Sequence, residues 1–293
     1  MAQQHSEVES VPQLSSVNQP ESSSATGLPS PRSFFWRPVF TLWQRELMRF
    51  VRQRSRLFGA LGQPLLFWLL LGAGLSPSFQ PAGAPEHLNY LEYFFPGTIL
   101  LILLFSAIFT NISIIEDRTS GFLQSVLVAP VHPAVLVLGK VGGGATLALV
   151  QAVLFLLLAP LLGIALTWRT LLSATLVLAL SAGAMTALGF AIAWRMDSTQ
   201  GFHVIMNVFL IPLWLLSGAF FPAAGTPAPL QWIIMINPVT YCLAALRQCL
   251  YAPEISRAMA LPPAGLALLI TVIFAIAMFG LALWSRRRAY RLP

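Results

Sequence analysis

Charged residues are scarce in this chain of 293 residues: Asp, Glu, Lys and Arg together make up 9% of it, whereas 57% of the residues are hydrophobic. Soluble domains carry about 25% charged residues, so this chain has too few to build a water-exposed surface. Acidic residues are fewer than basic ones, 10 against 17. This excess does not indicate a nucleic-acid partner, because the arginines flank apolar runs instead of gathering on one polar face. The composition predicts an integral membrane protein.

The residues of metal sites, nucleotide sites and catalysis are scarce too. The two cysteines, Cys242 and Cys249, would lie about 10 Å apart on a helix, too far for a disulfide, and such positions are typical of apolar packing. Four scattered histidines without a CxxC pair give no metal site. No GxxxxGK[ST] motif is present, so the chain has no phosphate-binding P-loop. We therefore expect no catalytic residue, metal or cofactor in this chain.

Residues 1–33 differ in composition from the rest of the chain. They are rich in Ser, Gln, Pro and Glu and contain no apolar run, which predicts a disordered cytoplasmic tail. A secretory signal would need a basic start and an apolar core, and neither is present. Glu7, Glu9 and Glu21, with no Arg before Arg32, also argue against a transit peptide.

Residues 57–293 contain six apolar segments that are long enough to cross a membrane. A helix needs about 20 residues for each crossing. Runs such as 152–162 do not alternate as the strands of a β-barrel would, so the spans are helices. Between the third and fourth spans only a tight hairpin at 167–170 remains. The predicted fold is an all-α membrane domain with spans at 57–76, 94–115, 141–166, 171–194, 201–221 and 263–284.

The distribution of Lys and Arg predicts the orientation of these spans. Of the 17 basic residues, only Arg169, Arg247 and Arg257 fall in the connections on one side. The positive-inside rule then places the other side, with both termini, in the cytoplasm. We expect a multi-pass protein of the inner or plasma membrane.

Two segments are predicted to be helical without crossing the membrane. Residues 34–56 combine an apolar, aromatic stripe with arginines, which favours a helix lying in the membrane interface over a simple juxtamembrane anchor. Residues 222–262 contain two short apolar pieces separated by Asn237-Pro238. Each piece is too short to cross, so a re-entrant pair of helices on the outer face is favoured over an ordinary surface loop.

Polar groups within the spans are few. Asn111 and Asn207 are the clearest, and either interhelical hydrogen bonding or the lining of a substrate path would explain them. His203 is typical of a solvated residue near a span end. The Gly142-Gly143-Gly144 run is more typical of close helix packing than of a functional loop. Without paired acids and bases, an ion-coupled transporter or a membrane enzyme is disfavoured, so transport would need an energy source elsewhere.

The segment from Ile114 to Lys140 is the most informative connection. Three charged residues, Glu116, Asp117 and Arg118, stand where the second span ends, and Gly121 precedes a short amphipathic stretch. This pattern predicts a charged turn followed by a short helix along the membrane surface, where a soluble partner could dock.

Three stretches of the chain resemble the type-2 ABC exporter permeases, the membrane halves of ATP-driven efflux pumps. The run of residues 116–131, with its Glu-Asp-Arg-x-x-Gly-Phe-Leu pattern, is similar to the coupling segment of that family, closest to drug- and antibiotic-resistance exporters. PLWLLSGAFFP at 212–222 resembles the fifth span, and the Asn237-Pro238 motif with Arg247 resembles the outer re-entrant segment. The likeness covers residues 34–290.

The resemblance implies a permease that exports a lipophilic or drug-like substrate, with a polysaccharide or lipid-linked glycan as the alternative. Its implied partners are membrane lipids, a second permease subunit in a homodimer, and a separate ATPase that holds ATP and Mg²⁺. Phe209 and the two asparagines are candidate substrate-path residues. The candidate ATPase-coupling residues are Glu116, Asp117, Arg118, Gly121, Phe122 and Leu123.

Overall fold

The computed structural model describes residues 31–75, 89–128, 132–222, 226–259 and 261–289. Within these ranges the chain is helical and contains no strand. Six helices are long and apolar enough to cross a membrane, which confirms the all-helical fold with six spans. The candidate spans are Phe58–Leu75, Tyr90–Thr119, Pro133–Leu162, Trp168–Ala193, Thr199–Ala219 and Ala264–Arg286.

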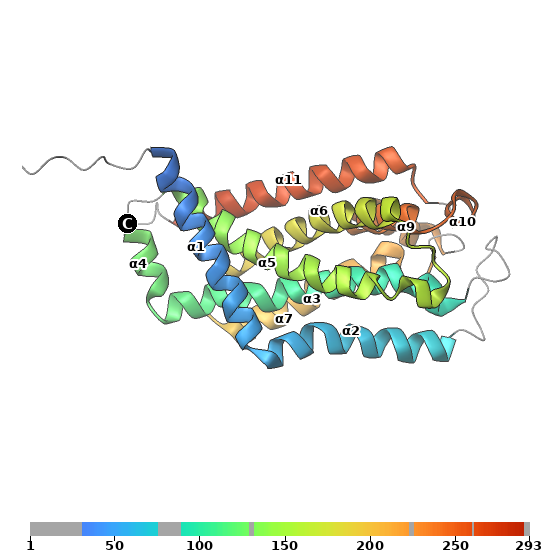
Figure 1. Ribbon diagram of the computed structural model, residues 1–293, viewed down its shortest axis with the longest axis horizontal. Helices are drawn as coiled ribbons and strands as arrows, with labels where there is room; N and C mark the ends of the chain where they lie inside the picture. Colours follow the sequence, from blue (N-terminus) through green and yellow to red (C-terminus); the bar gives the residue numbers. More distant parts are fainter. Residues whose placement is uncertain (1–30, 76–88, 129–131, 223–225, 260, 290–293) are drawn as a thin grey trace, which may run out of the picture.

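The bundle is built around α3, the helix from Tyr90 to Thr119 (Figure 1). Helices α2 (Arg54–Leu75), α5 (Pro133–Leu156), α6 (Trp168–Ala193) and α7 (Thr199–Trp214) pack on it, and α11 (Ala264–Ala289) packs on α6. The most apolar window of α3 is 94% buried, against 22% for those of α2 and α11. The core therefore surrounds α3, and the outer helices present apolar side chains to their surroundings.

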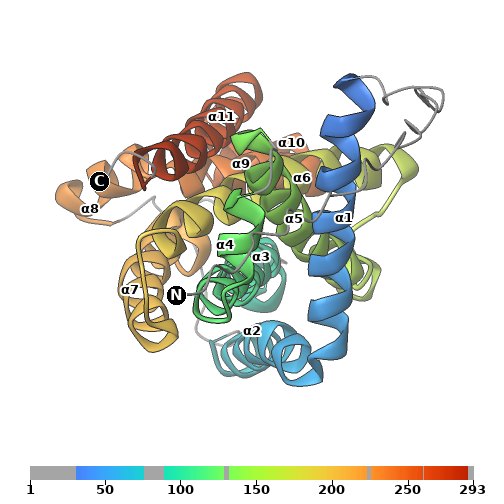
Figure 2. The same ribbon diagram turned by 90° about the vertical axis from the view of Figure 1, so that its left-hand side faces the viewer.

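Helix α1 (Pro31–Arg52) lies across one end of the bundle, where it packs mainly on α5 and lies close to the short α4 (Phe122–Val128) (Figures 1 and 2). We call this the α4 end. The predicted interfacial helix at 34–56 is divided at Gln53, and α2 begins at Arg54. The predicted apolar stripe is divided as well: Phe50 is buried against the bundle, while Trp36 stays 63% exposed.

The opposite end, which we call the α9 end, carries α8 (Ala228–Ile236), α9 (Pro238–Leu250) and α10 (Pro253–Ala258). The bend between α8 and α9 is 81°. Asn237 accepts a hydrogen bond from the Val239 amide and so caps α9. Helix α9 packs on α6 and α11, with residues such as Leu246 fully buried. This burial favours the predicted re-entrant pair over a surface loop.

Some helix boundaries differ from those expected from hydropathy. Helix α5 begins at Pro133 and ends at Leu156, and a 3₁₀ turn, η2 (Ala159–Leu162), and an extended stretch then lead to α6. Pro160 has no amide hydrogen to continue the helix, but its apolar neighbours keep the hydropathy high, so the predicted span reached 166. The expected tail lies outside the described residues except for residues 31–33, which belong to α1.

Candidate functional site

The turn between α3 and α4 depends on a glycine. Gly121 has a φ of +74°, in the left-handed region that costs an L-residue with a side chain about 1–2 kcal/mol. A Cβ atom built at Gly121 would meet no other atom within 4 Å. The backbone conformation, and not a lack of space, therefore requires glycine here. The α3–α4 turn directs α4 away from the bundle axis (Figure 1).

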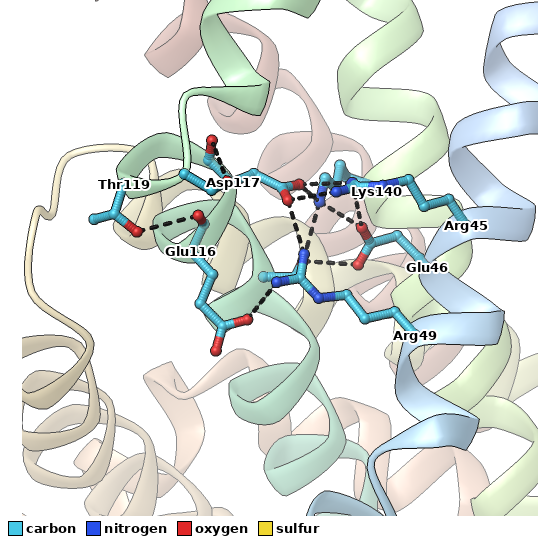
Figure 3. Close-up of polar contacts among 9 residues, drawn as sticks. Arg45, Glu46, Arg49, Glu116, Asp117, Thr119 and Lys140 are labelled. Atoms are coloured by element: carbon cyan, nitrogen blue, oxygen red, sulfur yellow. Dashed lines mark hydrogen bonds and ion pairs between the residues drawn. The ribbon is translucent and has the colours of Figure 1, made fainter.

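Asp117, in the last turn of α3, is 1% exposed and bonds three cations (Figure 3). The guanidinium of Arg45 binds both of its carboxylate oxygens, at 2.9 and 2.7 Å, and Arg49 donates to Oδ1 at 2.8 Å. The Lys140 ammonium on α5 also bonds Oδ2. The hydrogen bond to Asp117 raises the pKa of Arg45 above its ordinary value, which keeps the guanidinium charged. Asp117 thus joins α3 to α1 and α5.

Lys140 bonds a second carboxylate, that of Glu46 on α1. Ser113 links the two: it accepts from Lys140 at 3.1 Å and donates to Glu46 at 2.7 Å. Arg49 also binds Glu116, with 2.6 Å between Nη2 and Oε2. Three acids and three bases therefore meet in one network, and this balance matters because an unpaired buried charge is strongly unfavourable. We call this network the charge cluster: Arg45, Glu46, Arg49, Glu116, Asp117 and Lys140.

Glycines in α5 allow α1 to come close enough for these bonds. A Cβ at Gly139 would lie 2.6 Å from the Cβ of Leu42, and one at Gly143 would lie 2.7 Å from the Cβ of Glu46. Gly139 and Gly143 are four residues apart and bracket Lys140, so they form the small-xxx-small pattern of closely packed helices. The predicted packing role of the glycine run is confirmed for Gly143 and also for Gly144, where a Cβ would lie 2.7 Å from Thr186 Cγ2.

Arg118 connects the same turn of α3 to another part of the bundle. Its guanidinium donates to the carbonyl oxygens of Met196, at 2.9 Å, and of Trp194. It also pairs with Asp197 at 2.8 Å, although Asp197 is 88% exposed and such surface pairs contribute little. The carbonyl contacts hold the connection between α6 and α7 against the end of α3.

Helix α4 has an inner and an outer face. Leu123 is 4% exposed, and the Arg45 guanidinium lies 3.7 Å above the Phe122 ring. Gln124 and Ser125 are exposed, and Val128 is 86% exposed. The structure therefore brings the six predicted coupling residues together at the base of α4, but most of their contacts are internal. The surface that a partner could reach is made by other residues of α4.

The predicted substrate-path residues are not brought together. Asn111 is 3% exposed and donates to the carbonyl oxygens of Ala107, at 2.7 Å, and Thr186, at 3.1 Å. Ala107 lies on the same helix, whereas the bond to Thr186 joins α3 to α6, as expected if Asn111 serves interhelical hydrogen bonding instead of lining a substrate path. Asn207 and Phe209 are exposed on α7.

The sequence pattern indicated only two of the six members of the charge cluster, Glu116 and Asp117, as site residues. Arg45, Arg49 and Lys140 served only as orientation signals, and Glu46 was not considered at all. Two features could have revealed them: Glu46 is the single acid among the arginines of 34–56, and Lys140 stands between glycines in an apolar helix.

The fold and this site define a multi-pass α-helical membrane protein. Its short helix α4 projects from one end of the bundle and is held there by the buried charge cluster. The chain belongs to the ABC-2 type transporter family, whose model matches residues 37–251. It is 28% identical over 236 residues to the putative transport permease ycf38 of Cyanophora paradoxa, which covers 80% of this chain and 79% of that protein.

Two further relatives come from bacteria. Nodulation protein J of Rhizobium meliloti (strain 1021) is 24% identical, over 72% of this chain and 78% of the relative. The inner membrane transport permease YadH of Escherichia coli (strain K12) is 22% identical, over 73% and 82%. Members of this family are the membrane permeases of ABC transporters, and the ATPase is a separate subunit. The chain is therefore a transport subunit and not an enzyme.

Proposed function

We propose that this chain is the permease subunit of an ATP-driven exporter, which moves a lipophilic or drug-like substrate out of the cytoplasm or the inner leaflet. A separate ATPase, carrying ATP and Mg²⁺, energises it. The observation that carries the proposal is the geometry of α4: its inner face is fixed by the charge cluster, and its outer face, ending at Val128, is free of other parts of the described chain.

The contacts at the α4 end suggest how force would pass. A partner that moves α4 moves Asp117, because Arg45 binds both this carboxylate and the Phe122 ring. Asp117 transmits the displacement to α1 and α5, while Arg118 transmits it to the connection between α6 and α7. ATP would then favour one arrangement of the spans by binding better to the ATPase conformation that accompanies it.

Charge supports the orientation. Basic residues at the α4 end include Arg45, Arg49, Arg52, Arg118, Lys140 and Arg195, whereas Arg169 and Arg247 lie at the α9 end. By the positive-inside rule the α4 end faces the cytoplasm, where an ATPase would bind. We place the protein in the inner or plasma membrane.

Exposed apolar side chains on α7 support a lipophilic substrate and a second permease subunit. Helix α7 exposes Val204, Val208 and Phe209, by 62%, 71% and 51%. Such a face can contact lipid, a lipophilic substrate or a second copy of the chain, and we propose that two copies enclose the path between them.

The test uses membranes in which this chain is co-expressed with the P-loop ATPase that co-isolates with it. Val128→Glu should abolish co-isolation and ATP-dependent transport into inside-out vesicles. The matched control is Ala165→Glu at the α9 end, since Ala165 is exposed in the connection between two spans and should tolerate the change without loss of the ATPase. The proposal would be contradicted if transport by the wild type persisted after ATP depletion. It would also be contradicted if the wild-type protein never co-isolated with an ATPase.

A further inference from the structure

Arg247 on α9 is a buried cation that pairs with no acid in the described part of the chain. It is 3% exposed and forms no ion pair with any described residue. Its guanidinium lies 4.3 Å from the centre of the Tyr93 ring and donates one long hydrogen bond, 3.4 Å, to the Tyr93 carbonyl oxygen. Its Nε is buried and has no hydrogen-bond partner among the described residues. The other N–H donors of the guanidinium face neutral groups of Tyr93, and no carboxylate among the described residues pairs with it.

A cavity of about 40 Å³ adjoins this guanidinium. The cavity lies where α3, α9 and the kinked turn η3 (Leu215–Ala219) meet, and its polar lining includes Tyr93, Ser217 and Thr240. Gly218, at a φ of +81°, shapes this turn, and its carbonyl oxygen accepts from the Tyr93 hydroxyl at 2.7 Å.

None of the polar side chains that line this cavity carries a negative charge to balance Arg247. The Ser217 hydroxyl donates to the Trp214 carbonyl oxygen at 2.6 Å, and the Thr240 hydroxyl donates to that of Ile234 at 2.7 Å. Neither lining hydroxyl balances the positive charge. A buried, unbalanced charge is strongly unfavourable, and every charge of the cluster at the α4 end is paired. An anion beside Arg247 would remove this imbalance.

The size of the cavity decides which anion. A single water molecule needs about 10–15 Å³ of cavity volume. A cavity of about 40 Å³ therefore has room for a small ion with one water molecule, but it is too small for a phospholipid headgroup or a transported molecule. We propose that Arg247 and this cavity form a binding site for a small monovalent inorganic anion such as chloride. The bound anion joins the bent pair of α8 and α9 to α3 and so stabilises the α9 end.

The test compares purified protein in chloride with protein in gluconate, a large anion, at constant ionic strength. The unfolding temperature of the wild type should rise with chloride and then saturate, as for a ligand that binds only the folded state. Arg247→Gln should remove this rise. Arg169→Gln is the matched control, because Arg169 is an exposed arginine near the start of α6, at the same end of the bundle. This variant should respond to chloride as the wild type does.

A second measurement uses only the wild type, and so does not depend on the folding of a variant. Equilibrium dialysis with radiolabelled chloride should give one saturable ion per chain, displaced by bromide and not by gluconate. Unfolding temperatures that are equal in the two salts would overturn the proposal. So would an absence of saturable chloride binding, or an Arg247→Gln variant that keeps the full response. These outcomes are independent of whether the chain binds an ATPase.

Discussion

The Lys140 ammonium on α5 bonds the Glu46 carboxylate on α1, and the two residues are only 5% and 4% exposed. These residues are 94 positions apart in the chain. Their contact attaches a helix that lies across the end of the bundle to a helix that runs along it (Figures 1 and 3). The Lys140 ammonium also bonds Asp117 on α3, so α1, α3 and α5 are joined at the base of α4.

Removing one partner of this pair should be far worse than removing both. Lys140→Met leaves Glu46 buried with Ser113 as its closest donor, and losing one member of a buried ion pair costs about 3–5 kcal/mol. The double variant with Glu46→Leu removes both charges and should recover more than half of that loss. Unfolding of the detergent-solubilised protein measures the double-mutant cycle. Losses that simply add would show that the two side chains are not coupled.

Neutralising Asp117 should uncouple ATP hydrolysis from transport. Asp117→Asn keeps the side-chain shape but removes the anion that three cations share, while the outer face of α4 is unchanged. The ATPase should therefore still co-isolate, and ATP-driven transport should fall at least tenfold. Asp197→Asn, at the 88% exposed partner of Arg118, is the control and should change transport less than twofold. Equal effects of the two substitutions on transport would contradict a special role of the cluster.

A side chain at Gly121 should disturb the α3–α4 turn. Gly121→Ala forces alanine into a left-handed conformation, at about 1–2 kcal/mol, and should lower both stability and co-isolation of the ATPase. Gly183 is the control: it lies inside α6, a Cβ there meets nothing within 4 Å, and alanine is favoured in helices by about 0.5–1 kcal/mol. A Gly121→Ala protein that matches Gly183→Ala in both assays would contradict the requirement for glycine.

Asn111 should matter for stability and not for substrate choice. Asn111→Ala removes the hydrogen bond to the Thr186 carbonyl oxygen, and such bonds between membrane helices average about 0.6 kcal/mol. Gly189 supports this assignment, because a Cβ there would lie 2.4 Å from the Asn111 amide nitrogen. Asn207→Ala, at an exposed position, should leave stability unchanged. A changed substrate profile in Asn111→Ala alone would favour the substrate-path hypothesis instead.

Hydropathy was sufficient to predict the spans, because a membrane-crossing helix such as α6 must be apolar along its whole length. The Gly121 turn was also predictable, since its three charged residues and the glycine lie within six positions of the sequence. The charge cluster was not, because its bonds depend on α1 crossing α5 at Gly139 and Gly143. No local pattern states which of several arginines meets Asp117. The same limit explains Asn111, whose partner Thr186 is 75 residues away.

The central claim is that a separate ATPase binds the outer face of α4. A photo-crosslinking amino acid at Val128 tests it most directly, with the same amino acid at Leu161 as the control at the opposite end. On irradiation of intact membranes, the Val128 position should form a single product, and mass spectrometry should identify in it a P-loop ATPase, while Leu161 yields none. Products with lipid alone at Val128, or the same ATPase product from both positions, would contradict the account.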